Sequence, residues 1–174
     1  EKTGAAADDG TAGVRAFVSG GRLASSQDTG QSGFGIVRWD GANNGPAIDS
    51  AGLGGVDLTA GNVVGIRVQV LSADLGFPFT FQAWLDGDND NTFSLFSDTE
   101  IAGAGPGVYD FLFTNFVGGP AGDLDFSRVG ALQLVLNNGV INDLDIQIDI
   151  IQNIPEPGTL ALVGATLLGL GAAR

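Results

Sequence analysis

Histidine, cysteine and methionine are absent from this 174-residue sequence, and lysine occurs once, at Lys2. These absences remove the usual general bases, thiol nucleophiles and zinc ligands. Only three glutamates are present, and nothing around them indicates the buried acid of raised pKa that glycoside hydrolysis requires. The composition therefore argues against an enzyme.

Basic residues are also scarce. The sequence has seven basic and twenty acidic residues, which gives a formal net charge of -13. Nucleic acid and anionic lipid surfaces would repel such a chain, whereas cations would be attracted to it. We expect Arg128, one of the few cations, to pair with Asp123 or Asp125. The chain begins at Glu1 without an initiator methionine, and we expect that a leader peptide has been removed.

Apolar residues recur at every second position in several short stretches, as in Phe77, Phe79 and Phe81. This period is typical of half-buried strands. Turn sequences rich in Gly and Asn separate the stretches, and no helical period occurs before residue 158. We predict an all-β fold, an antiparallel β-sandwich of jelly-roll type. The predicted strands cover 14–18, 34–39, 66–70, 77–84, 92–97, 108–113, 132–136 and 144–150. Residues 24–32 are expected to form a loop whose Ser and Thr hydroxyls could carry O-linked sugar.

Three segments follow from these patterns. Residues 1–12 lack any period and form an N-terminal arm, residues 13–152 form the sandwich domain, and residues 153–174 form an apolar C-terminal tail. At this length a single domain buries a hydrophobic core.

The stretch "WLDGDNDNTFSLFSDTE" carries three aspartates at alternate positions in a Gly- and Asn-rich turn. This spacing lets carboxylates converge on one hard cation, and Ca²⁺ is the ion we expect. The EF-hand pattern is incomplete, because Asn stands where that loop has Gly and no helices flank it. The alternative is a solvated acidic hairpin turn. The candidate calcium ligands are Asp86, Asp88, Asp90, Asn91 and Asp98.

Exposed aromatic side chains on a jelly-roll sandwich stack against sugars in many binding modules. The candidates for such a platform are Trp39, Trp84 and Tyr109. Trp84 falls opposite the Phe-rich face of its strand and is expected to face solvent or a groove. The alternative is that the two tryptophans cap the edges of the sandwich.

The chain ends in "PEPGTLALVGATLLGLGAAR", in which residues 158–173 carry no charge. This apolar segment falls just short of the ~20 residues that span a bilayer as a helix. The three parts, Pro-Glu-Pro, an apolar stretch and a terminal Arg174, resemble the PEP-CTERM sorting signal of exported bacterial proteins. The resemblance implies a Gram-negative source, processing by an exosortase, and a place at the cell surface or in the biofilm matrix.

The apolar tail must be shielded from water, because each exposed Leu side chain loses about 1.5–3 kcal/mol of the free energy that burial would provide. Lipid would provide it, and so would a neighbouring copy, as a helix bundle or as a strand inserted into an incomplete sandwich. We predict a secreted structural protein that assembles into a filament or surface layer. The alternative is a polysaccharide-binding matrix module anchored by the tail. The sorting and assembly residues are Pro155, Glu156, Pro157, Leu160, Leu162, Leu167, Leu168 and Leu170.

Overall fold

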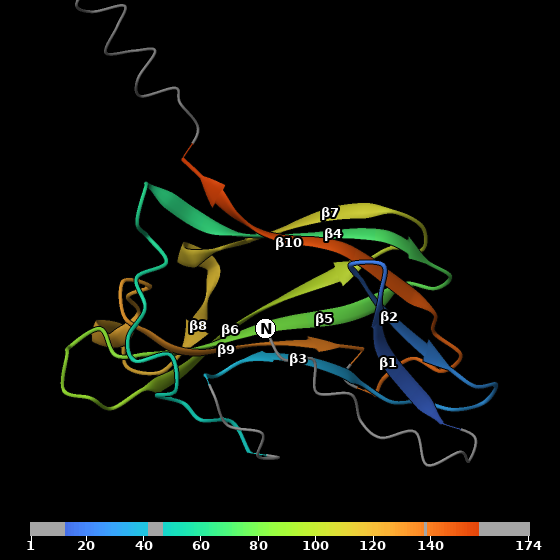
Figure 1. The fold of residues 1–174 in the computed structure, drawn as a ribbon, viewed down its shortest axis with the longest axis horizontal. Helices are drawn as coiled ribbons and strands as arrows, with labels where there is room; N and C mark the ends of the chain where they lie inside the picture. Colours follow the sequence, from blue (N-terminus) through green and yellow to red (C-terminus); the bar gives the residue numbers. More distant parts are fainter. Residues whose placement is uncertain (1–12, 42–46, 138, 157–174) are drawn as a thin grey trace, which may run out of the picture.

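The computed structural model describes residues 13–41, 47–137 and 139–156, which form two antiparallel five-stranded sheets (Figure 1). The first sheet has the order β1(Val14–Ser19), β2(Arg22–Gln27), β10(Ile146–Pro155), β4(Val63–Ala73), β7(Gly107–Leu112). The second has the order β3(Gly35–Trp39), β9(Val129–Leu136), β5(Phe77–Leu85), β6(Ser94–Ala102), β8(Val117–Gly118). Two short 3-10 turns, Phe113–Asn115 and Ala121–Asp123, complete the described elements. The predicted β-sandwich is confirmed.

The core between the sheets follows from the alternation along β5. Phe77, Phe79 and Phe81 are each about 1 % exposed, because every second side chain of a strand points to the same face. Phe111 on β7 of the opposite sheet meets Phe79 edge to face, with ring centroids 5.2 Å apart. Such pairs stabilise the sandwich beyond their buried area. The alternate residues of β5 are thereby held on the outer face of the second sheet.

The last strand, β10, occupies the middle of the first sheet. It pairs with β4 from Ile146 to Pro155 and with β2 only from Ile146 to Ile148. Its pairing with β2 also corrects the expected loop at 24–32, because β2 covers residues 24–27 of that stretch. Within the described residues, no helix combines the length and the hydropathy needed to cross a bilayer.

Candidate functional site

A hydrogen-bonded row of polar side chains crosses the outer face of the second sheet. Arg38 on β3 donates from Nε to Oε1 of Gln133 on β9 at 2.6 Å. Gln133 donates from Nε2 to Oε1 of Gln82 on β5 at 2.7 Å. Ser97 on β6 lies opposite Gln82 in the strand register and extends the row. The strand order β3-β9-β5-β6 is what brings these four residues into line.

Two further rows flank this polar row on the same face. On one side Thr80 and Thr99 share a hydroxyl hydrogen bond of 2.9 Å. On the other side lies Trp84, half-buried, opposite Ala131 of β9 and Leu95 of β6. An indole ring therefore stands two residues along β5 from the amide of Gln82, with hydroxyls at the other flank.

The strand register places no carboxylate of the described residues on this face, although the protein has a net charge of -13. Among the described residues, the strand register places fourteen side chains on it, and only the guanidinium of Arg38 is charged. These side chains are Ile36, Arg38, Pro78, Thr80, Gln82, Trp84, Leu95, Ser97, Thr99, Ile101, Val117, Ala131, Gln133 and Val135.

The acidic turn after β5 gathers three carboxylates. One oxygen each from Asp86, Asp88 and Asp90 lies within 4.8 Å of the others. Asp86 is buried, whereas Asp88 and Asp90 are exposed. The turn is closed by its own backbone, because the Asp90 N–H donates to Asp86 Oδ1 at 2.9 Å. The predicted convergence of the three aspartates is therefore present in the fold.

Arg128 already neutralises the buried member of this cluster. Its Nη2 lies 2.7 Å from Asp86 Oδ2, and its Nε donates to the Asp86 carbonyl oxygen at 3.0 Å. The hydrogen bond from Arg128 lowers the pKa of Asp86, so that carboxylate stays ionised. Desolvation within the turn raises the pKa of the exposed Asp88, and the charges of Asp90, Asp123 and Asp86 raise it further. The expected pairing of Arg128 with Asp123 or Asp125 is replaced by this contact.

The two remaining candidate ligands differ in position. Asn91 is exposed in the same turn, with a left-handed backbone φ of 66°. Asp98 lies outside the cluster, because it sits on β6 opposite Phe81. Its Oδ2 atom is buried without a hydrogen-bond partner in the described residues, and burial raises the pKa of this carboxyl.

The three aromatic candidates occupy separate places. Trp84 lies on the outer face of the second sheet, while Trp39 points inward and stacks on Phe81 at a centroid distance of 5.9 Å. Tyr109 packs edge to face on Phe79 at 5.0 Å, and its hydroxyl accepts a hydrogen bond from the Gly103 N–H. The structure therefore does not bring them together into one platform.

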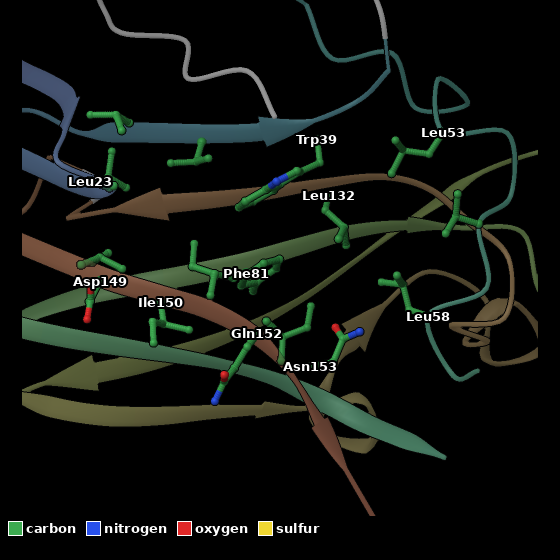
Figure 2. A pocket seen from close by; sticks show the side chains of 17 residues that line it. Leu23, Trp39, Leu53, Leu58, Phe81, Leu132, Asp149, Ile150, Gln152 and Asn153 are labelled. Carbon is green, nitrogen blue, oxygen red and sulfur yellow. The ribbon is translucent and has the colours of Figure 1, made fainter. Parts of the chain in front are cut away.

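A cavity of about 550 Å³ opens between the sheets beside β10. Trp39, Phe81 and Leu132 border it from the second sheet, and Ile150 and Asn153 of β10 border it from the first (Figure 2). Of the sorting and assembly residues, Pro155 ends β10 and Glu156 follows it, where its N–H donates to the Asn62 carbonyl at 2.7 Å. Pro157, Leu160, Leu162, Leu167, Leu168 and Leu170 lie outside the described residues.

Sequence reasoning missed Arg38, Gln82 and Gln133. Arg38 and Gln82 occupy polar positions that alternate with inward-facing apolar residues, and that alternation was the available signal. Gln133 is buried in an otherwise apolar strand, so its sequence carried no such signal. The alternation shows that a side chain points outward, but not which strand lies next to it.

Comparison with known proteins identifies first the fold and then the sorting motif. The structure is similar to that of a family 11 carbohydrate-binding module from Clostridium thermocellum, solved in complex with a β-1,3-1,4-mixed-linked tetrasaccharide. The two share 12 % identity over 82 % of each chain, with a TM-score of 0.52. A CBM4 structure matches at 14 % identity over 86 % of this chain and 82 % of its own, with a TM-score of 0.41. The first likeness shows the fold alone.

Residues 153–174 match the PEP-CTERM protein-sorting motif. The chain is therefore an exported or cell-surface protein of a Gram-negative bacterium, of the kind sorted by an exosortase. The search of curated proteins found no match to this sequence.

Proposed function

We propose that this exported protein is a non-catalytic polysaccharide-binding module and that the outer face of the second sheet is its binding surface. One observation carries the proposal: the hydrogen-bonded row from Arg38 through Gln133 to Gln82 runs beside Trp84 on a face without carboxylates. The solved module with this fold holds a mixed-linked tetrasaccharide, which supports a sugar as the ligand.

The chemistry of the row suits vicinal hydroxyls. A glutamine amide offers both a donor and an acceptor in one plane, so it can hydrogen-bond two neighbouring hydroxyls of one sugar ring. The hydrogen bonds within the row fix the amide orientations before a ligand arrives, which reduces the entropy lost on binding. In the described structure Gln82 Nε2 has no partner of its own, so it is available to donate.

Trp84 would supply the apolar contact. Its half-buried indole offers a flat surface on which the C–H face of a pyranose can stack. The overall charge of -13 repels an anionic glycan, whereas a neutral glycan carries no charge and is not repelled. We therefore propose an uncharged polysaccharide, with adjacent equatorial hydroxyls, as the ligand class.

Affinity electrophoresis and titration calorimetry with mixed-linkage β-glucan, xylan and alginate test this proposal. We expect binding to the neutral glycans and a loss of at least about tenfold in Gln82→Ala and Trp84→Ala, since each removes on the order of 1.5 kcal/mol or more. Gln69→Ala, a half-buried glutamine on β4 of the other sheet, is the matched control and should bind as the parent does. Equal loss in the control, or no neutral glycan bound, would refute the assignment of this face.

Calcium binding at the turn stays a prediction. Three carboxylate oxygens within 4.8 Å suit a hard oxygen-seeking cation, but a Ca²⁺ ion there would have to share Asp86 with Arg128. Asp88, whose pKa is raised by desolvation within the turn and by neighbouring acids, is the carboxylate that an added cation would relieve most. Calorimetric titration of EDTA-treated protein with Ca²⁺ tests this prediction, with Asp88→Asn as the comparison. Absence of Ca²⁺ binding in the parent protein would refute it.

Self-association through the C-terminal segment is the second candidate function. The observation that favours it is the cavity beside β10, where the first sheet has an open strand edge.

A further inference from the structure

The first sheet contains a notch beside β10. β2 begins after a turn at Gly20 and Gly21, and it pairs with β10 only as far as Ile148. Along residues 149–154, β10 pairs with β4 on one side, and no described strand bonds to it on the other. At a rise of ~3.3 Å per residue, this open edge is about 20 Å long. The notch is therefore the place of a missing strand of about six residues.

The open edge borders the apolar cavity. Trp39, Phe81 and Leu132 of the second sheet form the cavity floor, and Leu53 and Leu58 close one end (Figure 2). The volume of about 550 Å³ falls within the ~300–1,000 Å³ of typical ligand pockets. The sandwich thus lacks both a strand in one sheet and the apolar side chains that this strand would place in the core.

An extended peptide satisfies both features at once. Its backbone N–H and C=O groups would hydrogen-bond to the open edge, and every second side chain would enter the cavity. An acyl chain would fill the cavity and leave the edge without hydrogen bonds, whereas a sugar would place hydroxyls against Leu and Trp side chains. Because an unpaired strand edge is a template for another strand, the peptide is the occupant that the geometry favours.

The charges at the rim indicate what kind of peptide fits. At one end of the notch Asp149 already pairs with Arg22, at 3.7 Å. The other end carries two exposed carboxylates, Asp57 in the loop that closes the cavity and Glu156 directly after β10. Neither of these two makes an ion pair within the part of the chain that the structure describes. A peptide with a basic residue at this end therefore complements the rim.

We propose that the notch is a docking site for an extended segment of another protein, about six residues long, with apolar side chains at alternate positions and a basic residue beside Asp57 and Glu156. The net charge of -13 attracts such a partner, whereas it repels a second copy of the same chain. The notch opens between the sheets, away from the proposed polysaccharide face, so either proposal can fail without the other.

Synthetic peptides with blocked termini test the proposal on the full chain. The probe is Val-Thr-Val-Thr-Val-Lys, and Val-Val-Val-Thr-Thr-Lys has the same composition without the alternation. Replacing the terminal Lys of the probe by Glu tests the charge at the rim. Two further versions of the probe are N-methylated at alternate amides, one at the odd positions and the other at the even positions. Only one of these two sets of amides faces β10 in an added strand.

Trp39 on the cavity floor reports binding through its fluorescence. The chain has two tryptophans, so Trp84→Phe leaves Trp39 as the only indole. Val56→Phe, made in that background, narrows the mouth of the cavity. Val140→Phe is the matched control, because Val140 is an exposed valine outside the cavity lining.

We expect the probe to bind at least about tenfold more tightly than the reordered peptide and the Glu version. One N-methylated version should lose binding while the other keeps it. Val56→Phe should weaken binding of the probe at least about fivefold, and Val140→Phe should leave it unchanged. Failure of the probe to bind, equal binding of the reordered peptide, or no loss from either methylated set would overturn the proposal, because the notch would then not pair with a strand.

Sedimentation without peptide tests the competing occupant, a second copy of this chain. We expect the parent, Val56→Phe and Val140→Phe to sediment alike at every concentration. Dimers that grow with concentration in the parent and in Val140→Phe, and are lost in Val56→Phe, would overturn the proposal by assigning the notch to self-association.

Discussion

Asp98→Asn should stabilise the protein at neutral pH. Asp98 faces the core side of β6, opposite Phe81, and its Oδ2 atom is buried without a hydrogen-bond partner in the described residues. Burial raises its pKa above the value in the unfolded chain. Its ionised form is consequently a cost to the folded state, and the substitution removes the charge while keeping the shape.

The size of the effect follows from the partial burial of this side chain. A buried polar atom left without a partner costs about 1–3 kcal/mol, and the lower end applies because Asp98 is only half-buried. A gain of about 1 kcal/mol in a chain of this length corresponds to a rise in Tm of about 2–4 °C. The nearby carboxyl of Glu100, whose pKa is raised by burial and then by Asp98, should titrate lower in the variant.

Urea unfolding of both proteins as a function of pH provides the assay. A raised folded-state pKa means that the penalty is full above that pKa and vanishes below the unfolded value of about 3.9. The difference in the free energy of unfolding should therefore be largest near pH 7 and disappear near pH 3. A variant less stable than the parent at pH 7, or a difference independent of pH, would refute the argument from an unpaired carboxylate.

The remaining predictions concern three other contacts, each measured by the urea midpoint. Asp110→Asn should destabilise by about 0.5–1 kcal/mol, because it removes the negative charge and one of the two 2.7 Å hydrogen bonds that Asp110 accepts from Arg67. Arg67 lowers the Asp110 pKa, so this loss should be present at neutral pH and fade below about pH 4. Arg128→Gln should lower the midpoint at pH 7 and recover in acid, because buried Asp86 loses its cation; an unchanged midpoint would contradict the pairing. Phe81→Ala should cost about 3–5 kcal/mol through a core cavity, and a loss below 1 kcal/mol would show that the core collapses to fill it.

The sequence predicts much of this fold because burial alternates along its strands. β5 shows the pattern most clearly, with Phe77, Phe79 and Phe81 buried and Thr80 and Gln82 outward. β2 escaped prediction because its Ala24, Ser25 and Ser26 are small or polar, and Ser25 is buried only through its neighbours in the sheet. Short polar residues carry no hydrophobic period, so tertiary pairing alone makes this stretch a strand.

The candidate sites depend on which strands lie side by side, and the pattern of a single sequence does not determine this. Arg38 and Gln133 are 95 positions apart, and Gln133 and Gln82 are 51 apart. Their contact is a consequence of the strand order β3-β9-β5, which local patterns leave open. The acidic turn was visible because its three aspartates are local, whereas Arg128, 42 positions from Asp86, was not.

The place of β10 also sets the order in which this protein can mature. Ile146 pairs with Ser25, 121 positions earlier, so the middle of the first sheet stays empty until the end of the domain has been synthesised. Contacts of such long range form slowly, so this strand closes the sheet late in folding. The sorting motif overlaps the end of that same strand, at residues 153–155. A protease that cuts after Glu156 would leave every described strand pair in place, whereas one that cuts a few residues earlier would begin to dismantle the sheet.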